Sequence, residues 1–202
     1  MKNLVRIDPH IRIAPESVPC PIIIRVTKFD GESAEKFSEQ ISKAHNTGQN
    51  IVPIIIDSYG GEVYSLLSMI SDIESATIPI ATIAVGKAMS CGSILLSCGA
   101  AGQRYMDANA IVMIHDVFNF SCGKTEEVKA DAKETDRISQ QIFHKMARKC
   151  GHKDKNYFLK LIHQKSHADW YLTPSDAKKH RLVNYIRVPS FVTTISLKID
   201  ME

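Results

Sequence analysis

The chain has 202 residues, and 25 basic and 22 acidic side chains give it a formal net charge of +3. So small an excess of scattered basic residues does not favour nucleic-acid binding. No apolar run reaches the roughly 18 residues of a membrane span, and residues 1–13 lack the apolar stretch of a signal peptide. We therefore expect a soluble, cytoplasmic, single-domain protein with neither a membrane nor a nucleic-acid partner.

The cysteines are odd in number and none are spaced as C-x-x-C. This pattern predicts reduced thiols rather than a disulfide framework or a zinc site. We expect no metal and no cofactor. The cysteines are Cys20, Cys91, Cys98, Cys122 and Cys150.

The first two thirds of the chain alternate between apolar strands and amphipathic helices. Each predicted strand is followed by turn residues such as Asp30-Gly31 or Gly60-Gly61. The alternation indicates an α/β fold with a largely parallel sheet, whose strand ends are the expected place for chemistry. After an irregular segment, 1–21, the predicted strands are 22–26, 51–56, 80–85 and 110–114, and the predicted helices are 34–45 (capped by Ser33), 62–76 and 90–99.

The last third of the chain begins with a long polar helix, predicted for residues 125–150. Its apolar residues are sparse, so we expect it to project from its own domain and pack against another subunit. Thr173 and Pro174 are typical of a helix start, and the helix should end near His180. The remaining predicted elements are a helix at 157–164 and strands at 182–188 and 191–197.

Ser90 lies where a strand meets a helix, in a turn of small residues. Such a turn presents the hydroxyl, and the free N–H groups of the first helical turn point towards developing negative charge. Locally, a serine that merely caps the helix is the more common explanation. Gly60-Gly61 also follows a strand, and an N–H from this loop with that of Cys91 can form an oxyanion hole.

A serine nucleophile needs a base, and only His115 among eight histidines directly follows an apolar strand. The other seven lie in polar or helical surroundings and are expected to face solvent. Asp169, among aromatic residues and just before a predicted helix start, is the preferred carboxylate to orient the imidazole. Asp116, Asp107 and Asp57 are weaker candidates, and a Ser–Lys dyad with Lys87 is a minor alternative.

With these residues in place, residues 22–186 resemble the ClpP family of serine peptidases. Four motifs occur in the family's order, and together they are far more specific than any one alone. They are the strand and glycine loop ending at Gly61, the turn and helix from Gly86 through Ser90, the strand ending at His115, and the segment from Asp169 to Ala177.

The resemblance implies a crotonase-like fold of stacked ββα units in one domain, 1–202, with a protruding handle region, 116–150. It implies a Ser90–His115–Asp169 triad, with Gly61 and Cys91 as oxyanion donors. It further implies a homo-oligomer of two stacked heptameric rings, whose chamber admits unfolded polypeptides or short peptides.

Several positions depart from the family's pattern. Residues 1–21 show no clear match to the axial loop that docks an ATP-driven AAA+ unfoldase, so that partner is left open. Tyr59 replaces the proline of the glycine loop, and Cys91 replaces a methionine. Two alternatives also stay open: a non-catalytic ring subunit that scaffolds an active relative, and a crotonase-type acyl-CoA enzyme on the same fold.

Overall fold

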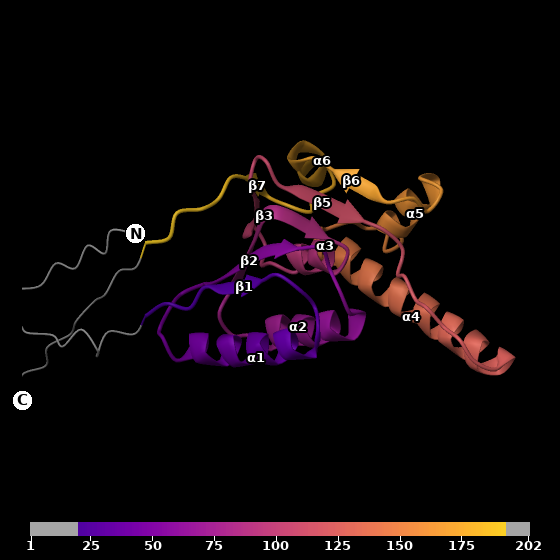
Figure 1. The fold of residues 1–202 in the computed structure, drawn as a ribbon. Coiled ribbons are helices and arrows are strands. Elements are labelled where there is room, and N and C mark those ends of the chain that lie inside the picture. The colour runs from indigo at the N-terminus through magenta and orange to yellow at the C-terminus, as the bar shows by residue number, and fades with distance from the viewer. Residues whose placement is uncertain (1–19, 193–202) are drawn as a thin grey trace, which may run out of the picture.

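Seven strands form one largely parallel sheet, which confirms the predicted α/β fold. The computed structural model describes residues 20–192 (Figure 1). Nearly all of the irregular segment 1–21, and residues 193–197 of the last predicted strand, lie outside the described residues. The strands are β1 (Ile24–Val26), β2 (Val52–Ser58), β3 (Ile80–Met89), β4 (Arg104–Met106), β5 (Ile111–Ile114), β6 (Trp170–Leu172) and β7 (Tyr185–Ile186).

Strand β3 is the branching point of the sheet. One edge pairs with β2, while the other pairs first with β4 and then with β5. The main path is β1-β2-β3-β4-β7, and β6 joins the far edge of β5 as the antiparallel member. The branch directs β5 and β6 out over the end of β3, which is where the candidate residues lie.

Residues 20–192 form six helices around this sheet. In Figure 1, α1 and α2 lie below β1 and β2, whereas α5 and α6 lie beside β6. α4 is different, because its outer part extends away from the rest of the chain. The helices are α1 (Gly31–His45), α2 (Val63–Ser75), α3 (Cys91–Ser97), α4 (Thr125–Lys149), α5 (Tyr157–Gln164) and α6 (Pro174–Lys179).

The two halves of α4 differ in burial, as its sparse apolar pattern predicts. Residues 125–137 include no buried residue, and the first buried side chain of the helix is Ile138. From there Ile142, Phe143 and Met146 pack into the main core. None of the helices formed by residues 20–192 is long and apolar enough to cross a membrane.

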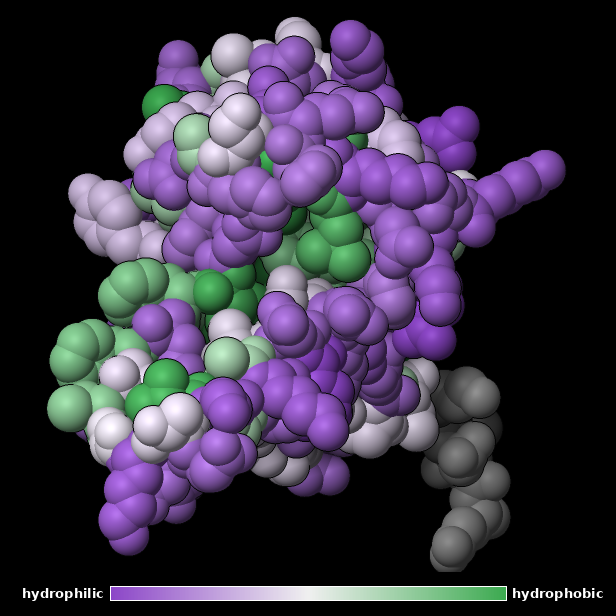
Figure 2. Space-filling model, turned by 90° about the vertical axis from the view of Figure 1, so that its right-hand side faces the viewer, coloured by the Kyte–Doolittle hydropathy of each residue, from purple (hydrophilic) through white to green (hydrophobic). Residues whose placement is uncertain are grey.

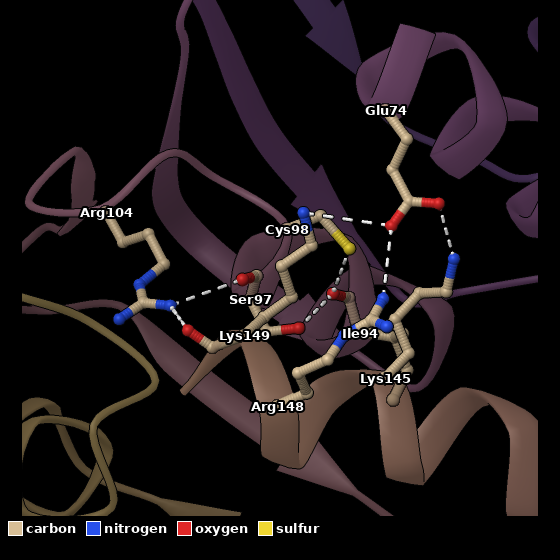
Figure 3. Close-up of polar contacts among 8 residues, drawn as sticks. All are labelled: Glu74, Ile94, Ser97, Cys98, Arg104, Lys145, Arg148 and Lys149. Carbon is tan, nitrogen blue, oxygen red and sulfur yellow. Dashed lines mark hydrogen bonds and ion pairs between the residues drawn. The ribbon is translucent and has the colours of Figure 1, made fainter. Parts of the chain in front are cut away.

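Polar contacts of Arg104 and Glu74 hold α4 against the rest of the fold (Figure 3). The Arg104 guanidinium, 5% exposed, donates to the Ser97 carbonyl that ends α3 and to the Lys149 carbonyl that ends α4. It therefore supplies positive charge to the negative ends of two helices. On the outside, Glu74 of α2 accepts from Lys145 at 2.6 Å. α3, which follows Ser90, and α4, whose side chains Ile142 and Phe143 lie near it, are thus joined at their C-terminal ends through Arg104.

The N-terminus of α1 differs from the prediction. The helix begins at Gly31 because the Asp30 carboxylate accepts a hydrogen bond from the Ser33 N–H at 2.8 Å. Asp30 is therefore the cap, and Ser33 is the residue whose N–H it satisfies. The Thr173 cap and Pro174 start of α6 are confirmed.

The strand expected to end at Gly86 continues instead to Met89. Gly86 adopts φ +69°, and the β2–β3 register shifts there, with Ile56 opposite Ala84 but Ser58 opposite Ala88. This bulge lets β3 continue past Gly86, a glycine that in the sequence indicates the end of a strand. The three-residue strands β4 and β6 were not predicted, and the strand predicted at 182–188 is reduced to Tyr185–Ile186.

The expectation that seven histidines face solvent is wrong for four of them, because His45, His144, His152 and His180 are each half-buried. The His152 ring stacks on Tyr157 with centroids 3.6 Å apart, and His180 Nδ1 lies 2.8 Å from the Tyr157 hydroxyl. Burial lowers the pKa of His180. These side chains support the packing of α5 and α6. His10 lies outside the described residues.

Candidate active site

Ser90 occupies a strained backbone position between β3 and α3. Its φ of 53° and ψ of −121° lie in a region that non-glycine residues avoid at a cost of about 1–3 kcal/mol. Its N–H donates to the Met113 carbonyl of β5 at 2.9 Å, which holds the turn in place. The Ser90 side chain makes no capping hydrogen bond. The local explanation, that the Ser90 side chain caps α3, is therefore wrong. The hydroxyl makes no hydrogen bond to the start of the helix.

The Gly60-Gly61 loop touches this turn, and both residues have to be glycine. Their φ values are +109° and +151°. A Cβ on Gly60 would lie 2.7 Å from the Ser90 Cβ, and one on Gly61 would lie 2.3 Å from the Phe29 carbonyl oxygen. The loop can therefore approach the serine only because it has no side chains at these positions.

Gly61 and Cys91, the two candidate oxyanion donors, are in direct contact. The Cys91 thiol donates to the Gly61 carbonyl, with sulfur and oxygen 3.2 Å apart. Among the described residues, neither backbone N–H donates to a backbone carbonyl. Both N–H groups are thus available to a ligand in the pocket that these residues line. Burial raises the pKa of the Cys91 thiol to about 11, so it is not a competing thiolate nucleophile.

The sheet register brings His115 and Asp169 to the same place. His115 directly follows β5 and Asp169 directly precedes β6, and these strands are antiparallel with Ile114 opposite Trp170. One further step along the ladder sets His115 opposite Asp169. Asp169 therefore precedes a strand, and not a helix start as expected from the sequence.

The hydrogen bonds of a closed triad are not formed. Among the described residues, none joins Ser90 to His115 or His115 to Asp169, and Asp169 is exposed. Catalytic hydrogen bonds are often long in unliganded structures and tighten when substrate binds. The structure thus brings the three residues to adjacent strand ends without closing the contacts between them.

A second carboxylate and a second histidine form a contact beside the first pair. His167 Nδ1 lies 2.5 Å from the Asp116 carboxylate, and His163 Nδ1 lies 2.9 Å from His167 Nε2. The contact joins the segment after β5 to the segment before β6, since Asp116 lies one residue beyond His115 and His167 two residues before Asp169. Nothing in the sequence singled out His167, because only the β5–β6 pairing brings it near Asp116.

A pocket of about 350 Å³ opens in front of Ser90. Figure 2, which views the molecule from the side towards which the β3 and β5 arrows of Figure 1 point, shows hydrophobic side chains gathered in a hollow. The α4 side chains in the pocket wall were not predicted, because the polar pattern of residues 125–150 indicated a helix that packs against another subunit. The apolar lining includes Val63, Ile94, Met113, Ile142 and Phe143, and the polar lining includes Ser90, His115 and Asp116.

The other sequence candidates have separate roles. Asp57 pairs with Lys87 at 2.7 Å, and the Asp107 carboxylate accepts from the Asn109 N–H within a turn. No cluster of three or more metal-ligating side chains occurs among residues 20–192.

A comparison with protein-family models gives one match that covers most of the chain. The model described as Clp protease matches residues 19–189. The matched span contains every element from β1 to β7 and every candidate site residue.

Proposed function

The chain belongs to the Clp protease family, a family of peptidases, and from that premise we propose that it is a serine endopeptidase acting through Ser90, His115 and Asp169. The observation that carries the proposal is the Ser90 backbone. A strained serine whose hydroxyl caps nothing, at a strand–helix junction beside a glycine loop, has the features of a presented nucleophile.

The proposed reaction is acyl transfer to the serine followed by hydrolysis. Ser90 Oγ attacks the peptide carbonyl while His115 takes its proton and then gives it to the leaving amine. Asp169 holds the imidazole in the required tautomer. The N–H groups of Gly61 and Cys91 stabilise the oxyanion, and removing one such donor costs about 100- to 1000-fold in rate. Water then releases the acyl group.

The substrate is an extended peptide segment that reaches the pocket as an unfolded or short chain. The pocket lining is mainly apolar, so a hydrophobic side chain next to the cleaved bond fits it best. The acyl-CoA alternative gains no support here, because the lining contains no lysine or arginine to meet the phosphates of the cofactor.

The proposed assembly is a pair of stacked heptameric rings built from this chain. The exposed half of α4 supports it, because residues 125–137 include no buried side chain within the protomer. Phe118 and Phe120, just before that helix, are more than 80% exposed. Apolar side chains at such exposure are typical of a surface that a partner covers.

A non-catalytic ring subunit is the second candidate, and the open triad favours it. A fluorophosphonate probe distinguishes the two, since it reacts only with an activated serine. We expect a covalent adduct on Ser90 in the assembled wild-type protein, and none in Ser90→Ala. Absence of the adduct from a correctly assembled wild-type sample would leave the scaffold as the better description.

A further inference from the structure

Lys87 lies three residues before Ser90, yet its ammonium is held elsewhere. Its Nζ donates to the Asp57 carboxylate at 2.7 Å and lies 4.5 Å from the centroid of the Tyr59 ring. The hydrogen bond that Lys87 donates to Asp57 raises the pKa of the lysine. A lysine base has to be neutral to accept a proton. This arrangement therefore disfavours the Ser–Lys alternative and leaves the role of Lys87 unexplained.

Both partners of Lys87 belong to the segment that leads into the glycine loop. Asp57 is the last residue but one of β2, Tyr59 follows the strand, and Gly60-Gly61 comes next. Lys87 is on β3, which leads directly to Ser90. The ammonium thus connects the two segments that carry the proposed oxyanion donors.

The β2–β3 backbone pairing is irregular just before the glycine loop, so it holds the loop only weakly against β3. Between Ile56 and Ser58 the β2 strand advances two residues while β3 advances four, from Ala84 to Ala88. Ladder hydrogen bonds are interrupted at such a bulge. The Asp57 carboxylate packs against Gly86 within it, where a Cβ would lie 3.0 Å from Oδ1. The Lys87–Asp57 pair spans the interruption.

We propose that Lys87 is a positioning residue for the oxyanion hole, which holds Asp57 and Tyr59 across the bulge and so fixes Gly61 relative to Ser90. The inference rests on the peptidase function proposed above. The pair is partly exposed, so it adds little to global stability. Its effect is expected on the transition state, because oxyanion donors act only at the correct distance.

The test is Lys87→Met, measured with a short fluorogenic peptide and a peptide boronate, which forms a tetrahedral adduct on a serine. We expect kcat to fall about tenfold with KM within twofold, less than the loss of a whole donor. The inhibition constant of the boronate should rise by the same factor as kcat/KM falls, with the pH profile unchanged in shape. A purely structural role would not produce this proportionality.

Lys160→Met is the matched control, because Lys160 pairs with Asp154 at the same 2.7 Å and neither residue lines the pocket. It should keep full activity. Lys87→Arg should retain most activity, since it keeps the charge, and Asp57→Asn should reproduce the loss without adding to Lys87→Met.

Each contrary result has a distinct meaning. Full activity in Lys87→Met overturns the positioning role and leaves the peptidase proposal intact. Equal, complete loss in Lys87→Arg and Lys87→Met, with His115→Ala still active, overturns it in favour of a lysine base. A wild-type enzyme without adduct or peptidase activity overturns both proposals.

Discussion

The strand-end site and the outer half of α4 are organised in opposite ways. At the site, backbone conformation sets the geometry: Ser90 is left-handed, Gly60 and Gly61 tolerate no Cβ, and a bulge re-aims β3. On the outer half of α4, residues 125–137 include no buried side chain. The first region is thus specified within one protomer, whereas the second makes no buried contact within it. Substitutions should affect activity in one and assembly in the other.

The largest effect is expected at Gly60. In Gly60→Ala the new methyl meets Ser90 at 2.7 Å, so we expect the rate of peptide cleavage to fall by about 100- to 1000-fold, as for loss of an oxyanion donor. Gly102→Ala is the control, because φ there is +75° but nothing lies within 4 Å of the added Cβ. It should lower stability by about 1 kcal/mol and keep its activity. Equal activity of the two variants would contradict the tight contact at Ser90.

Arg104 gives the next largest effect, this time on stability. Arg104→Met leaves the terminal carbonyls of α3 and α4 without their buried donor, so we expect the free energy of unfolding to fall by about 2–4 kcal/mol. Arg137→Met is the comparison, since Arg137 pairs with Glu134 on the exposed half of α4, where solvent screens the pair, and it should contribute far less than Arg104. Urea unfolding of both variants measures the contrast, and similar losses would refute it.

A charge on the exposed half of α4 should change assembly alone. Val128 is 36% exposed within the protomer, so Val128→Asp should leave its stability within about 0.5 kcal/mol. If this half of α4 joins two rings, sedimentation of Val128→Asp should show loss of the double-ring species. Lys133→Asp, at an exposed position of the same half, shows whether charge alone has this effect. Unchanged sedimentation of Val128→Asp would remove Val128 from the proposed contact.

The smallest effect is expected for the stability contribution of Glu74 at acidic pH. Burial raises its pKa, but the hydrogen bond and charge of Lys145, with Lys149 and Arg148, lower it below the ordinary value of 4.5 overall. The stabilisation by Glu74 is therefore fully present above pH 4.5 and is lost as pH falls through the lowered folded-state pKa. Glu74→Gln should cost less than about 1 kcal/mol at pH 7. In urea titrations, this difference from wild type should shrink on acidification, and a constant difference would argue against the ion pairs.

The sequence predicted the elements whose signals are local and missed those that depend on pairing. Apolar runs indicated β2 and β5, and the threonine–proline cap indicated α6. β6 was not foreseen, because three residues carry too little periodicity, and so Asp169 was placed before a helix. The continuation of β3 past Gly86 depends on a bulge against β2. Ser90, His115, Asp169, Gly61 and Cys91 could be nominated as strand-end residues, but His167 and the Lys87–Asp57 pair appear only through cross-strand contacts.

The branching of β3 has a consequence for local unfolding. Thr82–Ala84 pair with β2 on one edge and β4 on the other, and Ala88 pairs with both β2 and β5, so β3 lies inside the sheet and its amides are protected on either edge. Hydrogen exchange should therefore be slowest along β3, immediately before the serine. The glycine loop has a single bridge to Phe29 and should exchange faster. Ser90, the proposed nucleophile, would then follow the slowest-opening strand of the protomer, and adjustment to a bound peptide would fall to the glycine loop opposite it.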